Sequence, residues 1–512
     1  MIPQKFLSVV STTAALFATP FAAATCSSSI AHPKVPQGKV LDLTAASVTN
    51  YQSGDSTLSF CNVTVTYTHP GWNDTIHVTV WLPLSNWNER LQGSGGGGYA
   101  MRSDDDTLAE AVGLNYAVVA TDGGHTPVSP NSESWSLDAS GNVNMPLLKD
   151  FAYVALNDAA IIGKNVTNSF YGHGPRYSYW NGCSTGGRQG LMLAQRYPTA
   201  YNGIMAAAPA INWPSFIVAE YWPQFVMNQL NTYPSACVLD SITNATIKAC
   251  DEIDGVKDGV ISAPDLCQFD PLTTVGQKVD CNGSSVSITK NDALVIKKTW
   301  EGLRSTNGSF LWYGLDKGAP LSGLAGTTCS SPSNCTGSPF SISADWISRF
   351  ILQDPSVDLT RLSHEDLIKI FTELKICYSS IIGIDNPDLS AFKQAGGKMI
   401  TWHGLADQLI FPNGTMQYYN RVEDKDSSVR DFYRFFEAPG VEHCRGGNGY
   451  VPVDPLDSVV SWVEEGTAPE TIAAATTDGA KHRNLCPYPL VSVYKGGDEK
   501  EASSYECRKS YS

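Results

Sequence analysis

One serine of the sequence stands in a setting typical of a nucleophile. The run Gly182-Cys183-Ser184-Thr185-Gly186 fits the pattern G-x-S-x-G and lies between a predicted strand near 177–180 and a predicted helix over about 187–197. On so sharp a strand-to-helix turn, the neighbours of the serine must be nearly free of side chains. The hydroxyl then lies beside a helix N-terminus, where backbone N–H groups face a developing oxyanion. The pattern predicts acyl transfer through Ser184, although a glycine-rich turn with a solvent-facing serine has the same letters.

Stabilising an oxyanion takes two backbone donors. The N–H of Thr185, directly after the serine, is the first expected donor. In turns of this kind the second donor comes from a loop after an earlier strand. The run Gly93-Ser94-Gly95-Gly96-Gly97-Gly98-Tyr99 is the candidate, and we expect Gly96 and Gly97 to donate. Plain flexible loops also contain such glycine runs.

A serine nucleophile needs a base and an acid that orients it, and in this arrangement the chain order is serine, acid, histidine. Asp407 directly follows a predicted strand at 398–403. If Asp407 is the acid, only two histidines come after it. His482 lies in a polar tail that looks exposed, whereas His443 closely follows a predicted strand at 432–436. We therefore predict Ser184, Asp407 and His443 as the catalytic residues. The histidines that follow Ser184 are His364, His403, His443 and His482.

A pair of cysteines supports the choice of His443. Cys183 immediately precedes the serine, and Cys444 immediately follows the histidine. A nucleophile and its base must come within hydrogen-bond reach, so their neighbours lie close enough for a disulfide. We expect a Cys183–Cys444 bridge; two unrelated buried thiols are the alternative.

The elements around these residues indicate an α/β-hydrolase core with a large inserted lid domain. Residues 39–82 alternate apolar and polar residues, as antiparallel strands do. Later apolar runs alternate with helical segments, which is typical of an α/β sheet. This alternation of apolar runs and helical segments stops between about 215 and 385. The core is therefore predicted over residues 25–215 and 385–512, and the lid over 216–384.

The N-terminus predicts export. Residues 1–24 read as a signal peptide, with Lys5, a mostly apolar stretch over 6–21, and small residues at Ala22-Ala23-Ala24. A buried N-terminal helix is the alternative. No later stretch is long and apolar enough to span a membrane. The formal net charge of −15 argues against nucleic acid or an anionic membrane as partner.

The cysteines and the glycosylation sequons also predict export. The 13 cysteines suit disulfides, and their odd number predicts one free thiol. Many N-x-Ser/Thr sequons indicate a secreted, extracellular glycoprotein with those sites in surface loops. The sequons begin at Asn62, Asn73, Asn165, Asn244, Asn282, Asn307, Asn334 and Asn413.

An acidic stretch of the lid has the composition of a calcium site. Asp251, Asp254 and Asp258 are interleaved with glycines and can surround a hard cation with carboxylate and carbonyl oxygens. The spacing is not that of an EF-hand. Cys250 and Cys267 flank the stretch and are expected to pair. An acidic turn between disulfides is the open alternative.

Three lid aromatics, Trp213, Trp222 and Phe225, could line a pocket for an aryl group. Core packing explains aromatic side chains at such spacing better.

Taken together, these motifs resemble the tannase and feruloyl esterase family. The resemblance rests on the run from Gly182 to Gly190, on Asp407 and on the pair His443-Cys444, and it spans nearly the whole mature chain. It implies an α/β-hydrolase core with a lid, phenolic-acid esters as substrates, and a structural Ca²⁺ in the lid. Carried over by position, the ligands would be the side chains of Asp251, Asp254 and Asp258 and the carbonyls of Val256 and Val260.

The resulting prediction is a secreted serine carboxylic-ester hydrolase that acts on phenolic-acid esters, free or linked to polysaccharide. Feruloyl esterase, releasing ferulic acid from plant cell-wall polysaccharide, is favoured, and tannase is the alternative. A non-catalytic, glycan-binding glycoprotein on a hydrolase scaffold is the second alternative. It should have lost a catalytic residue, and all three are present here.

Overall fold

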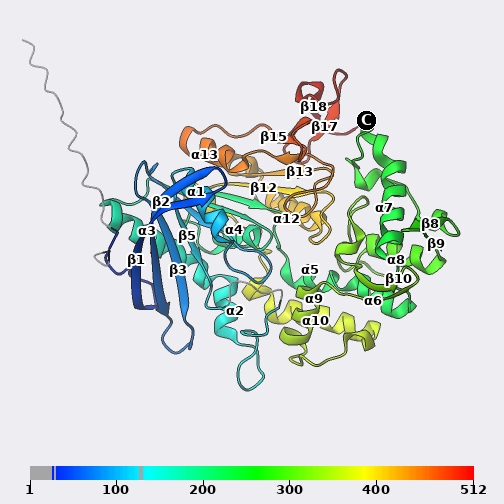
Figure 1. Cartoon of the computed structure of the whole chain (residues 1–512), viewed down its shortest axis with the longest axis horizontal. Helices are drawn as coiled ribbons and strands as arrows, with labels where there is room; N and C mark the ends of the chain where they lie inside the picture. Colours follow the sequence, from blue (N-terminus) through cyan, green and yellow to red (C-terminus); the bar gives the residue numbers. More distant parts are fainter. Residues whose placement is uncertain (1–25, 28–29, 126–130, 512) are drawn as a thin grey trace, which may run out of the picture.

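A single mixed sheet runs through the centre of the structure, which is a computed structural model describing residues 26–27, 30–125 and 131–511 (Figure 1). The predicted signal peptide, residues 1–24, lies outside the described residues. The sheet has nine strands in the order β1-β2-β3-β5-β4-β6-β7-β12-β13. Strands β1, β2 and β3 are antiparallel to their neighbours, as the alternation over 39–82 predicted. The six strands from β5 to β13 in this order are parallel to one another. Their bounds are β1 Lys39–Ser53, β2 Ser56–Thr68, β3 Ile76–Pro83, β4 Arg90–Ser94, β5 Ala117–Thr121, β6 Tyr177–Cys183, β7 Gly203–Ala207, β12 Lys398–Gly404 and β13 Tyr433–Ala438.

Helices cover both faces of the sheet, which explains why most residues of its parallel strands are buried. Successive side chains of a strand point to opposite faces, and in β5 Val119 joins the larger core cluster whereas Val118 joins the smaller one. The larger cluster includes α3, α4 and α12, and the smaller includes α1 and α13. The predicted α/β-hydrolase fold is confirmed. The covering helices are α1 Asp105–Gly113, α2 Met145–Ala152, α3 Val154–Tyr171, α4 Thr185–Arg196, α12 Pro412–Lys425 and α13 Pro455–Glu465.

The segment between β7 and β12 forms the helical mass on the right of Figure 1. It contributes no strand to the nine-stranded sheet, and its two hairpins stand apart from it. Its elements are α5 Trp213–Ala219, α6 Trp222–Leu230, α7 Ala236–Cys250, β8 Lys278–Cys281, β9 Ser284–Ser287, α8 Lys290–Glu301, β10 Thr327–Ser331, β11 Asn334–Gly337, α9 Ser341–Asp345, α10 His364–Ile382 and α11 Ser390–Gln394.

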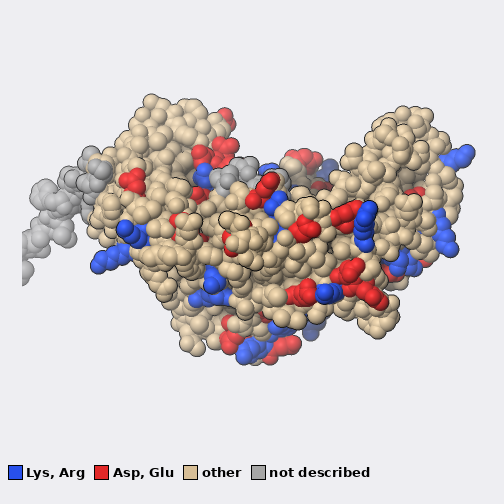
Figure 2. All heavy atoms as spheres, turned by 90° about the horizontal axis from the view of Figure 1, so that it is seen from below, with Lys and Arg blue, Asp and Glu red and all other residues tan. Residues whose placement is uncertain are grey.

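Small sheets complete the C-terminal part. They are built from β14 Val451–Pro452, β15 Ile472–Ala475, β16 His482–Leu485, β17 Val491–Tyr494 and β18 Tyr505–Arg508. None of the described helices is long and apolar enough to cross a membrane. On the face shown in Figure 2, Lys and Arg side chains are scattered among Asp and Glu and form no continuous basic surface.

Six disulfides form, and one exposed thiol, Cys377, remains, as the odd cysteine number predicted. Both expected bridges, Cys183–Cys444 and Cys250–Cys267, are present. The others are Cys26–Cys61, Cys237–Cys281, Cys329–Cys335 and Cys486–Cys507.

Six of the eight sequon asparagines are exposed, as expected for glycosylation sites. The prediction of surface loops is wrong for three of these six, because Asn165 lies in α3, Asn244 in α7 and Asn334 in β11. It is also wrong for the remaining two, which are only partly exposed. Asn62 lies within β2, and its side-chain oxygen is buried. Asn413 lies in α12, and its amide donates a hydrogen bond to Asp316 over 2.7 Å.

Candidate active site

Ser184 occupies a tight turn between the end of β6 and the start of α4. Its φ of 63° lies in the left-handed region, which is strained for a residue with a side chain. Two glycines make the turn possible. A Cβ on Gly182 would lie 2.6 Å from the backbone of Gly186, and a Cβ on Gly186 would lie 3.2 Å from Gly95. The sequence pattern G-x-S-x-G thus corresponds to the sharp strand-to-helix turn that it predicted.

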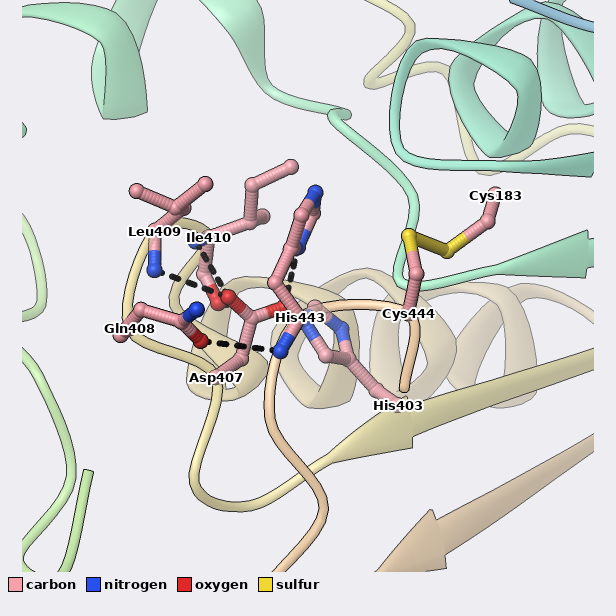
Figure 3. Close-up of a disulfide and its surroundings, with 8 residues drawn as sticks. All are labelled: Cys183, His403, Asp407, Gln408, Leu409, Ile410, His443 and Cys444. Carbon is pink, nitrogen blue, oxygen red and sulfur yellow. Dashed lines mark hydrogen bonds and ion pairs between the residues drawn. A yellow bond between two sulfur atoms is a disulfide. The ribbon is translucent and has the colours of Figure 1, made fainter. Parts of the chain in front are cut away.

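Asp407 and His443 meet at the ends of neighbouring strands. Asp407 follows β12, and His443 follows β13. Asp407 Oδ2 lies 2.8 Å from His443 Nδ1, and Gln408 Oε1 accepts a hydrogen bond from the backbone N–H of His443 (Figure 3). The acid is fully buried, whereas the histidine reaches the surface of a cavity. His482 lies far along the chain in β16 and is exposed, as its polar surroundings predicted.

A second histidine, His403, contacts Asp407 from within β12 and was not assigned a role from the sequence. Its Nε2 lies 3.1 Å from Asp407 Oδ2 and 3.2 Å from the carbonyl oxygen of Ile410. Both partners only accept hydrogen bonds, so Nε2 carries a proton. The other ring nitrogen lies 2.9 Å from the Thr415 hydroxyl. The signal in the sequence was a histidine at the end of a strand, four residues before the acid.

The charges of this group reinforce one another. Burial alone would raise the pKa of Asp407, but the two histidines and the hydrogen bonds lower it far below its ordinary value. Burial alone would lower the pKa of His443, but the charge of Asp407 and its hydrogen bond raise it above 6.5. Asp407 also accepts backbone N–H groups of Leu409 and Ile410, each over 2.9 Å. The carboxylate is therefore fixed in its charged form, ready to stabilise an imidazolium.

The Cys183–Cys444 bridge joins the residue before Ser184 to the residue after His443. The two Cα atoms are 5.9 Å apart although 261 positions separate the cysteines. Ser184 and His443 line the same cavity. No direct hydrogen bond joins their side chains within the described chain, which is common where no substrate is bound, because such contacts tighten on binding.

The glycine loop after β4 packs against the turn. The backbone N–H of Gly186 donates to the Gly96 carbonyl over 2.8 Å, and the Thr185 hydroxyl donates to the Gly98 carbonyl over 2.6 Å. The backbone N–H of Gly96 is already bonded to Gln189 Oε1 at 3.0 Å. Gly97 is therefore the residue of the expected pair whose N–H remains available, together with the N–H of Thr185 at the start of α4. Gln189, a partner that the sequence did not reveal, therefore occupies the N–H of Gly96 and leaves that of Gly97 as the second oxyanion donor.

The cavity beside Ser184 has a volume of ≈ 560 Å³. Trp213 lies in its wall, whereas Trp222 and Phe225 do not and instead stack on each other with centroids 5.5 Å apart. The preference for core packing thus holds for two of the three lid aromatics. The largest group of lining residues is aromatic or aliphatic: Ala210, Trp213, Phe216, Ile217, Phe340, Ile342, Leu409 and Ile410.

The acidic loop predicted to bind calcium surrounds a buried guanidinium. Arg483 lies 3.2 Å from Asp258 Oδ2 and 3.7 Å from Asp254 Oδ2, and all three side chains are buried. Asp251 Oδ1 accepts the backbone N–H groups of residues 258–260 at 3.0–3.3 Å.

The charge of this loop fits a divalent cation. The loop carries the three carboxylates of Asp251, Asp254 and Asp258, and the one guanidinium within ion-pair distance of Asp254 and Asp258 leaves an excess of two negative charges. Burial raises the pKa of Asp254, whose Oδ2 has no hydrogen-bond partner. Within the described chain no hydrogen bond reaches the carbonyl oxygens of Val256 or Val260. The free oxygens are of the carboxylate and carbonyl types that Ca²⁺ prefers.

A tighter acidic group lies elsewhere, next to α2 and α3. Potential ligand atoms of His69, Asp74 and Asp150 all lie within 4.8 Å of one another. The His69 ring is bonded on both sides, to Asp74 at 2.5 Å and to Asp158 at 3.1 Å. These bonds raise the pKa of His69 to about 9 despite burial, and burial raises the pKa of Asp150 to about 8. Protonation of His69 and Asp150 therefore reduces the negative charge of this group.

Comparison with known proteins agrees with this geometry. The family model described as "Tannase and feruloyl esterase" matches residues 61–508. The chain is similar to a protein of Arthroderma benhamiae named "Probable feruloyl esterase", with 42% identity over 94% of this chain and 93% of that protein. It is also similar to "Probable feruloyl esterase B-2" of Neosartorya fischeri, with 31% identity over 84% of this chain and 83% of the relative.

Two solved structures resemble the whole fold. "Tannin acyl hydrolase from Aspergillus niger" superposes with a TM-score of 0.85 and 28% identity, covering 95% of this chain and 93% of that one. "Feruloyl esterase B from Aspergillus oryzae" superposes with a TM-score of 0.76 and 28% identity, covering 93% and 97%. With the bridged serine and histidine turns already described, these matches show that the chain belongs to the tannase and feruloyl esterase family of carboxylic ester hydrolases.

Proposed function

We propose that this protein is a secreted feruloyl esterase, which hydrolyses ferulic-acid esters of plant cell-wall polysaccharide. The observation that carries the proposal is the mostly apolar, aromatic-lined cavity of ≈ 560 Å³ at Ser184 and His443. An apolar cavity of this size accommodates one aromatic acyl group. The names of the relatives support a phenolic-acid ester as substrate.

In the proposed mechanism, His443 accepts the proton of Ser184 as the hydroxyl oxygen attacks the ester carbonyl. The N–H groups of Thr185 and Gly97 stabilise the oxyanion. His443 then protonates the leaving alcohol, and Asp407 stabilises the imidazolium throughout. Water, activated by the same histidine, attacks the acyl-enzyme and releases the acid.

The test is kcat/KM on methyl ferulate, methyl caffeate, methyl gallate and tannic acid. Ser184→Ala should abolish turnover of every ester at an unchanged melting temperature. Preference for methyl gallate and tannic acid would favour the second candidate, a tannase, which the similarity to the Aspergillus niger structure supports. Turnover of none of the four by the wild-type protein would refute both and favour a non-catalytic, glycan-binding role.

Secretion and calcium binding belong to the proposal. Six disulfides suit an oxidising compartment, and residues 1–24 have the composition of a signal peptide. The side chains of Asp251, Asp254 and Asp258 and the carbonyls of Val256 and Val260 would hold Ca²⁺, which would neutralise the loop. Sequencing the N-terminus of the protein from culture medium tests export and cleavage near residue 24, and retention of the full-length chain inside the cells would contradict it.

A further inference from the structure

A single carboxyl group lies in the wall of the cavity and takes no part in the proposed chemistry. Glu220 caps the C-terminal end of α5 and is 2% exposed. Together with Trp213, Phe216 and Ile217 it lines the cavity. These positions have the spacing i, i+3, i+4 and i+7, which places them on one face of the helical segment. Glu220 therefore continues an apolar, cavity-facing stripe with one polar group.

Glu220 has no partner among the described residues. Its Oε2 is buried without a hydrogen bond. Arg445 is the other charged side chain of the wall, but unlike Glu220 it is exposed. The remaining polar side chains have assignments. Ser184, Thr185 and His443 surround the reacting ester, and the Ser103 hydroxyl donates to the Gly95 carbonyl. A buried polar group without a partner is costly, so the free Glu220 carboxyl points to a ligand group.

The protonation state of Glu220 defines which ligand group it can bind. Burial and the nearby charge of Asp407 raise its pKa well above 4.5. This shift favours the protonated carboxyl, in which one oxygen donates and the other accepts a hydrogen bond. A phenolic hydroxyl has the complementary donor and acceptor.

We propose that Glu220 is a specificity-determining residue that binds the aromatic hydroxyl of the phenolic acyl group. This inference rests on the proposed function, because it needs an aromatic acid in the cavity. The surrounding apolar wall would exclude water from the ring, so a hydroxyl placed there without Glu220 would lose its hydrogen bonds. The single carboxyl also matches one hydroxyl better than the three of a galloyl group.

The test compares two substrates that differ by one hydroxyl, methyl p-coumarate and methyl cinnamate. In Glu220→Leu, the ratio of their kcat/KM values should fall about 10- to 100-fold, because the hydroxyl loses its partner. Turnover of methyl cinnamate should persist. Glu220→Gln keeps one donor and one acceptor and should restore most of the preference for the hydroxylated ester.

Ile217→Ala is the matched control, because Ile217 lies on the same face but makes no hydrogen bond with its side chain. It should change kcat/KM of both esters by similar factors. An unchanged ratio in Glu220→Leu, or a ratio that Glu220→Gln does not restore, would overturn the proposal. If Glu220→Leu does not fold, the kcat/KM ratio of the two esters is compared between Glu220→Gln and wild type instead. A wild-type protein that shows no preference for the hydroxylated ester would then overturn the proposal. Failure of the proposed function looks different, since the wild type would then turn over neither ester.

Discussion

Removing the Cys183–Cys444 bridge should damage both stability and catalysis, and the two effects can be separated. The perturbation is the double variant Cys183→Ala/Cys444→Ala, which leaves no unpaired thiol behind. Without the bridge, His443 keeps its hydrogen bonds to Asp407 and Gln408, but no direct covalent link joins its turn to that of Ser184. A displacement of about 1 Å between reacting groups can lower a rate about 100-fold. We therefore expect kcat/KM to fall by about that factor.

The effect on stability follows from the length of chain that the bridge closes. The cysteines are 261 positions apart, and the chain-entropy relation gives about 5.6 kcal/mol for such a loop. The Cys329–Cys335 bridge closes a separation of 6, for which the same relation gives about 2 kcal/mol. Because it lies in the β10–β11 hairpin, Cys329→Ala/Cys335→Ala is a control without a link to the catalytic turns.

The assay combines melting temperature with kcat/KM on methyl ferulate, measured well below the melting temperature of each variant. The expected result is a larger loss of stability in the Cys183/Cys444 variant and a loss of kcat/KM confined to it. If that variant keeps kcat/KM within about twofold of wild type while fully folded, the bridge does not position the base, and the argument from proximity is wrong.

Three further predictions concern protons and calcium. The acidic limb of the pH profile of kcat/KM should have its midpoint above 6.5, because the raised pKa of His443 leaves less neutral base at lower pH; a midpoint below 6.5 would contradict the role of Asp407. The raised pKa values of Asp150, about 8, and His69, about 9, mean that the folded state binds their protons more tightly than the unfolded state. Their contribution is complete below the unfolded values, 3.8 for Asp150 and 6.5 for His69, and is lost steadily up to the folded values of about 8 and about 9, so the melting temperature should fall as the pH rises from 6.5 to about 9. Asp150→Asn should flatten this fall, whereas melting curves that shift in parallel with wild type would refute the assignment. Chelation should lower the melting temperature of wild type but not of Asp254→Asn, and equal shifts in both would contradict the calcium site.

The parts that the sequence predicted are those in which local pattern and chain order suffice. The turn at Ser184 is encoded within five residues, since a Cβ at 182 would collide with the backbone of Gly186 and a Cβ at 186 would press tightly against Gly95. Asp407 and His443 follow strands, and the carboxyl ends of adjacent parallel strands meet at one edge of the sheet. Chain order and the cysteine pair were therefore enough to select them.

The parts that the sequence did not reveal depend on contacts between distant segments. The N–H of Gly96 is taken by Gln189, which lies 93 positions further along the chain. The carboxylate of Asp258 meets Arg483 across 225 positions. Glu220 sits among apolar residues, and its place in the cavity wall depends on how α5 packs against α9 and α10. Periodicity marks the face of a helix but not the surface that the face meets.

The bridge between the two catalytic turns has a consequence for the lid. Between Cys183 and Cys444 the chain leaves the sheet at β7, builds the whole helical mass and returns at β12. Because the covalent link fixes base to nucleophile directly, that alignment need not be transmitted through the intervening segment. The lid is thereby free to diverge in length and lining while the hydrolytic machinery keeps its shape. Exchanging the segment between β7 and β12 for that of a relative should consequently transfer acyl-group preference as a module.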